Sequence, residues 1–332
     1  MSTFCTLFDS KYIDKGLALY ESLCNVIENF KFYVFAFDQI AYDILVDMNL
    51  KNMIVINLND FETERMLAVK KKRSVAEYCW TCTPIIIDYV LVNFKESQCT
   101  YLDADLYFFA SPEELLNEIE NSKYSIIITE HRFPTDKMED GLRESGKYCV
   151  QFNTFNNDEN GRKVLNTWKE QCLDWCYYTK EGDKKGDQKY LENWTTTFEG
   201  VHELQHLGGG VAPWNISQYK LKETEELVFS SKGKDFKLIF YHFQNIRYLP
   251  FGFVNIKSGT KERNIKGKIY IPYLIHIEKI RKILKDKYEL NFSIKKGYFT
   301  NPILRFIQDY ITPFKVKHCS DIISIRTLRR EI

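Results

Sequence analysis

Two carboxylates interrupt an otherwise apolar and aromatic run, residues 101–109, in the first third of the chain. Asp103 and Asp105 are separated by a single alanine, and the run around them is typical of a buried β-strand. Burying ionised carboxylates without a partner is costly, so we expect a cation to neutralise them. Carboxylate oxygens suit hard divalent ions such as Mg²⁺ and Mn²⁺. Because residues i and i+2 of a strand point to the same face, both carboxylates could bind one ion. A turn at a strand end, in which one acid caps a backbone N–H, is the alternative.

The first half of the chain alternates between short apolar segments and helical segments. This alternation predicts an α/β fold with a mostly parallel sheet flanked by helices. In such sheets, ligands bind beyond the carboxyl ends of the strands. Asp9, Asp38 and the Asp103–Asp105 pair all follow predicted strand ends, which predicts one shared cleft. The predicted strands are residues 4–8, 32–37, 53–58, 100–102 and 125–129, and the predicted helices are residues 12–26 and 84–94.

The second half of the chain is less regular and becomes more basic towards its end. Helices are predicted over residues 160–177, 273–287 and 301–311, and a strand is predicted over residues 238–243. We therefore expect a main domain over residues 1–256 and a mostly helical, basic region over residues 257–332. Lysines accompany apolar side chains in that region, so it could contact a membrane surface peripherally or simply pack on the main domain.

Composition is that of an ordinary globular chain rather than a nucleic-acid-binding or secreted one. The 332 residues are 44% hydrophobic and 27% charged, and the net charge of +1 creates no field that would attract nucleic acid. The N-terminal residues lack the basic segment of a signal peptide, and no apolar run approaches the roughly 18–20 residues that span a bilayer. Nine cysteines without framework spacing indicate reduced thiols, so we expect a cytoplasmic protein.

The segment around Asp103 and Asp105 resembles the D-x-D region of the GT-A nucleotide-diphospho-sugar transferases, especially glycosyltransferase family 8 and its relatives. Four further segments resemble motifs of that family in the same order, and the likeness covers about residues 3–250. They are residues 4–12, residues 148–153, the Asp187–Gln188 pair within residues 186–191, and Tyr241–His242. Residues 73–84, 186–191 and 205–215 also resemble an uncharacterised bacterial branch of these transferases.

The resemblance implies a GT-A fold and an enzyme that transfers a sugar, with a UDP-sugar as the favoured donor, to a saccharide or lipid-linked saccharide. Asp103, Asp105 and His242 would bind a divalent cation, Mn²⁺ or Mg²⁺, at the donor's two phosphates. Asp187 would bind donor-sugar hydroxyls, and Gln188 would lie beneath the anomeric carbon. A retaining mechanism and a place in bacterial surface-polysaccharide synthesis are also implied. The expected nucleotide-sugar-binding residues are Thr6, Phe8, Asp9, Tyr12, Asp38, Arg73, Asp103, Asn153 and Arg247.

The chain departs from the family pattern in two places. The family histidine usually opens the motif H-x-x-G-x-x-K-P-W, whose lysine pairs with phosphate, but here His242 is followed by F-Q-N-I-R-Y. Arg247 could take the cationic role. The N-x-G pattern is also absent, because Asn153 is followed by Thr154 and Phe155. His242 could alternatively be a hydrogen-bonded histidine at a strand end.

Two further residues have a functional and a structural interpretation. Arg73 closes a basic run, residues 70–73, and an arginine can clamp a diphosphate with two parallel hydrogen bonds. The structural alternative for the run is a solvated helix face. Asp187 could cap the helix that follows it, and this role is compatible with binding a sugar.

Residues 202–206 read H-E-x-x-H, the sequence of a zinc-protease motif. That motif requires a helix so that both histidines share one face, yet only seven residues separate Gly200 from Gly208. No third ligand follows at short range, so we expect no zinc site here. His206 and Gly209 are expected to line the acceptor side of the cleft instead.

Two other functions fit parts of the pattern. A nucleotidyltransferase of similar fold would consume a nucleoside triphosphate and release pyrophosphate, but the glycine-rich signature expected after the first strand is absent. A non-catalytic saccharide-binding or scaffold protein would bind glycans equally well in EDTA, and the intact carboxylate pair argues against it.

Overall fold

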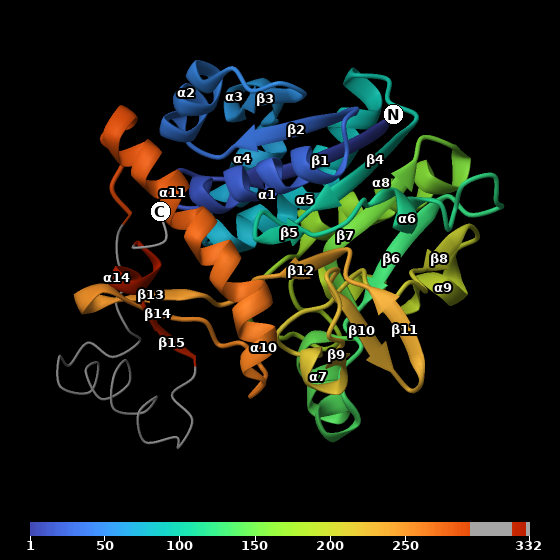
Figure 1. Cartoon of the computed structure of the whole chain (residues 1–332). Coiled ribbons are helices and arrows are strands. Elements are labelled where there is room, and N and C mark those ends of the chain that lie inside the picture. Colours follow the sequence, from blue (N-terminus) through green and yellow to red (C-terminus); the bar gives the residue numbers. More distant parts are fainter. Residues whose placement is uncertain (293–320, 330–332) are drawn as a thin grey trace.

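The computed structural model describes residues 1–292 and 321–329 and contains a seven-stranded central sheet with the order β3-β2-β1-β4-β7-β6-β8 (Figure 1). Neighbouring strands run parallel except at β7, which pairs antiparallel with β4 and β6. The predicted α/β class and mostly parallel sheet are therefore confirmed. The strands are β1 (Ser2–Phe8), β2 (Phe30–Ala36), β3 (Met53–Asn57), β4 (Gln98–Leu102), β6 (Ile126–Glu130), β7 (Tyr148–Asn156) and β8 (Val201–Glu203).

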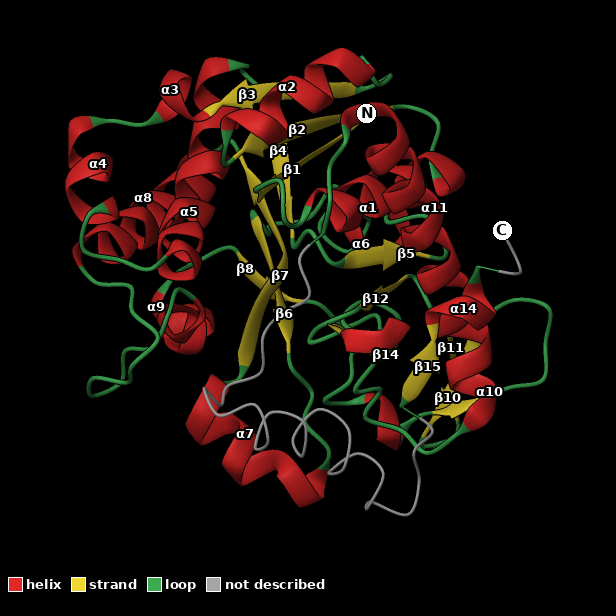
Figure 2. Ribbon diagram, turned by 90° about the vertical axis from the view of Figure 1, so that its left-hand side faces the viewer, coloured by secondary structure: helices red, strands yellow, loops and turns green. Residues whose placement is uncertain are grey.

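Helices cover both faces of the sheet, with α1, α6 and α11 on one face and α4, α5 and α8 on the other (Figure 2). Separate apolar clusters fill the two layers, because strands buried on both faces present apolar side chains to each. In β1, Phe4 belongs to one cluster and Cys5 to the other. The helices are α1 (Ile13–Val26), α4 (Glu64–Lys70), α5 (Val75–Asn93), α6 (Glu113–Leu116), α8 (Glu159–Asp174) and α11 (Ile271–Tyr288).

Helix α5 begins earlier than the helix predicted over residues 84–94. The Ser74 hydroxyl accepts the Glu77 N–H, and the Glu77 carboxylate accepts the Ser74 N–H at 2.8 Å, which makes a capping box. This cap starts the helix at Val75 and leaves Pro84 in its interior.

Helix α5 is also the one described helix that is long and apolar enough to cross a membrane by length and composition, contrary to the expectation of no such segment. Half of its apolar window, 50%, is buried inside the structure. The helix packs against β1, β4 and α8, as a core helix does. Its length and composition are therefore weak grounds for a membrane span.

A short antiparallel pair brings the second half of the chain to the carboxylate pair. Strands β5 (Leu106–Phe108) and β12 (Phe240–His242) pair with His242 opposite Leu106, which confirms the strand predicted over residues 238–243. The Ile239 N–H donates to the Gly208 carbonyl at 3.0 Å. A Cβ on Gly208 would lie 1.8 Å from the Lys237 carbonyl oxygen, so glycine permits this close approach.

Two small antiparallel sheets and several short helices complete the described chain. The sheets are β9 (Lys220–Leu221) with β10 (Val228–Ser231) and β11 (Lys234–Lys237), and β13 (Arg247–Leu249) with β14 (Phe253–Asn255) and β15 (Ile322–Ser324). The helices are α2 (Gln39–Met48), α3 (Leu58–Phe61), α7 (Met138–Ser145), α9 (Trp194–Thr197), α10 (Arg263–Ile265) and α14 (Ile325–Leu328).

The C-terminal helix α11 packs along α1 (Figure 1). Arg281 Nε donates to the buried carboxylate of Asp14 at 2.6 Å, and His276 hydrogen-bonds Glu21 at 2.5 Å. The helix predicted over residues 273–287 is confirmed, whereas the one predicted over residues 301–311 lies outside the described residues. A domain boundary at residue 256 stays a prediction.

Candidate active site

Asp103, Asp105 and His242 converge at the carboxyl end of β4. The strand ends at Leu102, and the Asp103 N–H then donates to the Gln151 carbonyl at 3.0 Å as the chain turns. His242 Nε2 lies 3.0 Å from Asp105 Oδ1 and 3.7 Å from Asp103 Oδ2. One ligand atom from each residue lies within 4.8 Å of the other two. The three residues could therefore hold one metal ion.

Burial and charge shift the titration of all three groups. Burial and the nearby Asp105 raise the pKa of Asp103 to about 7, against the opposing effects of His242 and Tyr101. Burial would also raise the pKa of Asp105, but His242 and Lys15 hold it well below its ordinary value. Burial opposes a charged imidazole, yet the carboxylates raise the pKa of His242. Two carboxylates with one imidazole at this spacing could hold a divalent cation.

Gln151 orients the His242 ring within the core. The Gln151 side chain is fully buried, and its Oε1 lies 2.8 Å from His242 Nδ1, which donates to it. This bond directs Nε2 and its lone pair towards the two carboxylates, the arrangement that a metal-ligating histidine needs. The Trp214 ring meets the His242 ring edge-on at 5.2 Å between centroids and limits its movement.

The loop between β1 and α1 meets the end of β2, and both contain predicted nucleotide-binding residues. Asp38 caps α2 by accepting the Ala41 N–H at 2.8 Å, and it also accepts the Ser10 N–H at 3.0 Å and hydroxyl at 2.7 Å. Asp9 accepts the Lys11 N–H at 3.1 Å, and burial together with Asp38 raises the pKa of Asp9. The structure therefore brings Asp9 and Asp38 together at adjacent strand ends.

Other predicted nucleotide-binding residues lie in β1, just before α1, and in the small sheet that contains β13. Thr6 and Phe8 are buried in β1, and Thr6 Oγ1 has no hydrogen-bond partner among the described residues. Phe8 packs on Gly16, where a Cβ would clash with its ring. Tyr12 precedes α1, and Arg247 begins β13. Nucleotide binding by these residues stays a prediction.

The predicted sugar-binding residues lie near the carboxylates. Burial and the neighbouring Asp103 raise the pKa of Asp187 to about 8, and the Asp187 side chain makes no capping hydrogen bond to the helix after it. Gln188 Nε2 donates to the Ser145 carbonyl at 2.6 Å. Asn153 is fully buried, and neither atom of its amide has a partner among the described residues. Contact between this amide and a ligand stays a prediction.

Arg73 is buried and bonded to the protein itself. Nη1 donates to the Cys172 carbonyl at 2.7 Å and to the Thr81 hydroxyl, and Nη2 donates to the Leu173 carbonyl at 2.9 Å. These bonds tie α5 to the end of α8. A solvated helix face therefore does not describe Arg73, and its role at a diphosphate stays a prediction.

The H-E-x-x-H segment lies in strand β8 and the turn after it rather than in a helix. His202 hydrogen-bonds Glu118 at 2.6 Å, whereas Glu203 pairs with Lys147 at 2.5 Å. The segment therefore lacks the helix that a zinc-protease motif requires, and among the described residues the potential metal site is the three-residue group at Asp103. Acceptor binding by His206 and Gly209 stays a prediction.

Sequence reasoning missed two residues of the site. Lys15 Nζ lies 3.9 Å from Asp105 Oδ2, and Gln151 holds His242. Gln151 lies inside residues 148–153, and Lys15 lies three residues after residues 4–12, two segments that carried the family resemblance. Their positions beside the motifs were the available signal.

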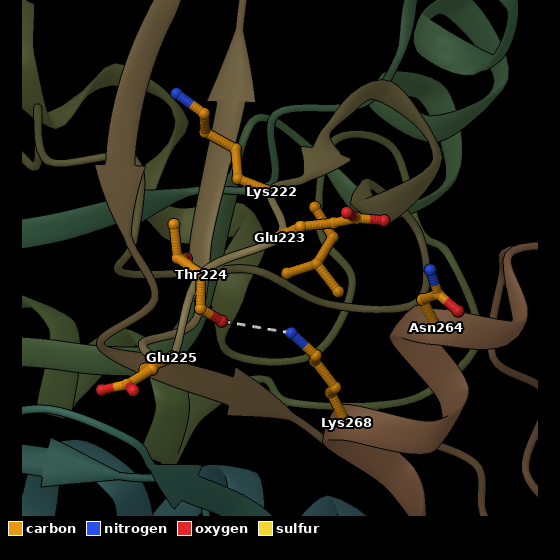
Figure 3. A pocket seen from close by; sticks show the side chains of 7 residues that line it. Lys222, Glu223, Thr224, Glu225, Asn264 and Lys268 are labelled. Atoms are coloured by element: carbon orange, nitrogen blue, oxygen red, sulfur yellow. Dashed lines mark hydrogen bonds between the residues drawn. The ribbon is translucent and has the colours of Figure 1, made fainter.

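A separate pocket of about 500 Å³ lies between the β9 segment and the helical segment after α10 (Figure 3). Lys268 Nζ donates to the Thr224 carbonyl across it at 3.2 Å. Its lining carries none of the predicted site residues, so we assign it no part in the reaction. The lining residues are Leu221, Lys222, Glu223, Thr224, Glu225, Asn264 and Lys268.

Solved glycosyltransferase structures align with parts of the chain. GlyE of Streptococcus pneumoniae TIGR4 is 15% identical, with 63% of this chain and 46% of that chain covered and a TM-score of 0.42. Mouse xyloside xylosyltransferase 1 is 11% identical, with 74% of this chain and 98% of that chain covered and a TM-score of 0.47.

No protein-family model matches the sequence, but relatives align along most of it. The uncharacterized proteins YfnD and YfnF of Bacillus subtilis (strain 168) are 28% and 29% identical, covering 84% and 83% of this chain and 90% and 92% of theirs. Glycosyltransferase GlyB of Streptococcus pneumoniae serotype 4 is 21% identical, covering 90% of this chain and 77% of its own. The chain is thus similar to a glycosyltransferase and to uncharacterised bacterial proteins, in agreement with the predicted resemblance and enzyme class.

Proposed function

We propose that this protein is a metal-dependent glycosyltransferase that moves a sugar from a nucleoside-diphosphate donor, a UDP-sugar by preference, to a saccharide or lipid-linked saccharide. One observation carries the proposal. Asp103, Asp105 and His242 come from segments more than a hundred residues apart, yet they meet at the carboxyl end of β4 with Nε2 facing both carboxylates. That edge of a parallel sheet is where ligands bind.

Asp103, Asp105 and His242 would have different roles in binding the ion that holds the donor diphosphate. A bound divalent cation would supply Lewis acidity that stabilises the charge gathering on the leaving diphosphate. Asp105 is ionised over the working pH range and would bind the ion directly. Asp103 would contact the ion or the ribose, and His242 would give its Nε2 lone pair once its proton has left. Gln151 keeps Nε2 aimed at the cluster.

The remaining residues would place the donor around this centre. Asp9, Asp38 and Tyr12 would bind the nucleoside at the ends of β1 and β2. Asp187 would bind the sugar hydroxyls beside Asp103. Asn153, whose amide has unused hydrogen-bonding capacity among the described residues, would also bind them. Gln188 would lie beneath the anomeric carbon, and a retaining mechanism is favoured by resemblance alone.

The proposal also includes a setting for the reaction. Acceptor binding would involve His206 and Gly209, and the product would enter a bacterial surface polysaccharide made in the cytoplasm. Helix α11 carries exposed lysines and an exposed Ile283, which fits a peripheral contact with a membrane that holds a lipid-linked acceptor. Sedimentation with vesicles containing anionic lipid tests that contact, and equal sedimentation of a variant with Lys282, Lys285 and Ile283 replaced would remove it.

Donor cleavage tests the proposed function directly. The purified protein is incubated with UDP-, GDP- and dTDP-sugars in Mn²⁺ or in EDTA, and nucleoside diphosphate release is measured. We expect Mn²⁺-dependent release from one donor class and its loss in Asp105→Ala. Release of pyrophosphate from a nucleoside triphosphate and sugar phosphate would indicate a nucleotidyltransferase instead. Glycan binding unaffected by EDTA, with no donor cleavage, would indicate a non-catalytic protein.

A further inference from the structure

Lys15 stands beside the acidic cluster in a position that helix stability does not explain. It lies in the first turn of α1, at the positive end of the helix dipole, where a cation is unfavourable. Only 13% of its side chain is exposed. An ammonium group removed from water to this extent requires anionic or hydrogen-bonding partners.

The partners of Lys15 within the protein are incomplete. Its Nζ lies 3.9 Å from Asp105 Oδ2, beyond the about 3.2 Å reach of a good N–H···O hydrogen bond. Nζ also lies 3.9 Å from the centre of the Tyr12 ring, a cation–π contact that holds the ammonium in place without using its N–H groups. No hydrogen bond joins Nζ to another described residue. Its donors are therefore free for an anion bound at the cluster.

Charge at the site points to the same kind of anion. Two ionised carboxylates and one divalent cation sum to zero, so Lys15 leaves the occupied site with a net positive charge. When the bond between the anomeric carbon and the diphosphate oxygen breaks, the electron pair stays on that oxygen. The leaving nucleoside diphosphate thus gains one negative charge, which a fixed neighbouring cation stabilises.

We infer that Lys15 binds the diphosphate of the nucleotide-sugar donor and supplies the cationic charge that the lysine of the motif H-x-x-G-x-x-K-P-W, absent from this chain, would otherwise provide. The inference rests on the proposed function and adds a residue to it. Lys15 belongs to α1, in the first half of the sequence, whereas His242 belongs to β12, in the second half. Tyr12 positions Lys15 through its ring.

Binding titrations of the full-length protein test this role. The diphosphate among UDP, GDP and dTDP that binds most tightly in Mn²⁺ is chosen, together with its monophosphate. We expect Lys15→Gln to lower the affinity for the diphosphate by about 10- to 100-fold, because charge-assisted hydrogen bonds are lost. The affinity for the monophosphate should fall less. Lys15→Met is the second neutral variant, and Lys15→Arg should retain most of the affinity. Lys51→Gln, at an exposed lysine that has no assigned part in the site, is the control and should change nothing.

Mn²⁺ binding without nucleotide separates this role from a structural one. Removing a cation near the metal site should leave Mn²⁺ affinity unchanged or raise it, because Lys15 repels the ion. Equal losses of Mn²⁺ and diphosphate affinity would show that Lys15 only supports Asp105, and would overturn the inference. Unchanged diphosphate affinity in both neutral variants would overturn it while leaving the proposed function intact. A wild-type protein that binds Mn²⁺ but none of the three diphosphates would overturn both.

Discussion

Two parts of this molecule are constellations of histidines and carboxylates, and they differ in whether these side chains converge. Residues 202–206 place two histidines and a glutamate within five positions, but β8 sends His202 to Glu118 and Glu203 to Lys147. Asp103 and Asp105 lie more than a hundred residues before His242, yet β5 and β12 bring the ligand atoms of the three residues within 4.8 Å.

The difference shows what makes a metal site in this fold. In the H-E-x-x-H segment each acid already has a cationic or N–H partner, so no negative charge remains for a metal. At the β4 end, burial and mutual repulsion raise the pKa of Asp103 to about 7, so the cluster lacks a sufficient counter-charge. The secondary structure beneath a motif thus decides whether its side chains converge.

The largest expected difference appears when one carboxylate is removed from each constellation in turn. Asp105→Ala should weaken Mn²⁺ binding by more than about 100-fold and abolish donor cleavage. Loss of a residue that only hydrogen-bonds a metal ligand lowers metal affinity by about 10- to 100-fold, and loss of a direct ligand should lower it further. Glu203→Ala should leave Mn²⁺ affinity unchanged. Calorimetric titration with Mn²⁺ measures both, and similar losses in the two variants would erase the distinction.

Replacing one glutamine near each constellation sharpens the comparison. Gln151→Leu removes the acceptor of His242 Nδ1 and should weaken Mn²⁺ binding by about 10- to 100-fold, as loss of an outer-sphere partner does. Gln151→Glu keeps an acceptor and should retain binding. Gln205→Leu, in the H-E-x-x-H segment, is the control. Unchanged affinity in Gln151→Leu would mean that the ring is held by Trp214 alone.

The pH dependence of metal binding should follow the carboxylate cluster. Mn²⁺ must displace one proton from Asp103 and another from His242, whose pKa is also raised. Its affinity should therefore fall by about tenfold per pH unit for each displaced proton, and by up to about 100-fold per unit where both groups are protonated. In the metal-free protein, Asp103 holds a proton that the unfolded chain releases near pH 4. The folded state therefore binds more protons between about pH 4 and 7, and its free energy of unfolding falls as pH rises through that window.

Thermal unfolding at pH 6 and pH 8 measures this linkage. The rise in Tm caused by Mn²⁺ should be larger at pH 8, and Asp103→Asn should reduce the difference between the two pH values. Glu203→Ala supplies the comparison at the other constellation. A shift that is equal at both pH values would contradict the proton displacement.

The smallest expected effect concerns Glu118, which organises the H-E-x-x-H segment. Its carboxylate accepts the Gln205 and His206 N–H groups at 2.8 and 2.7 Å and bonds His202. Glu118→Ala should lower the free energy of unfolding by about 1–3 kcal/mol, because two partly buried donors, His202 and the His206 N–H, and the exposed Gln205 N–H lose a charged acceptor. Urea unfolding measures the loss. A change in Mn²⁺ affinity in this variant would link the segment to the metal site.

Much of the fold was predictable because its signals are local. Alternating apolar and helical segments indicated the sheet, and the apolar run around Asp103 indicated the strand end at which β4 stops. The early start of α5 was also encoded, since Ser74 and Glu77 have the spacing of a capping box. The carboxylates and His242 were identified through family order rather than through local pattern.

The contacts that complete the site depend on tertiary pairing, and sequence pattern does not reveal them. Gln151 reaches His242 because β7 lies beside β4 and β12 pairs with β5. Lys15 reaches Asp105 because α1 packs next to β5. Arg73 has the residue type of a phosphate clamp, but the contact between α5 and α8 places carbonyl oxygens around its guanidinium.

The central claim is that Asp103, Asp105 and His242 bind one divalent cation together with the donor diphosphate. Pulsed electron paramagnetic resonance of the Mn²⁺–UDP complex tests it most directly, since it detects nuclei within bonding range of the ion. We predict nitrogen coupling from one imidazole, which disappears in His242→Ala, together with phosphorus coupling from UDP. Mn²⁺ that shows no imidazole nitrogen, or nitrogen coupling that persists in His242→Ala, would contradict the claim.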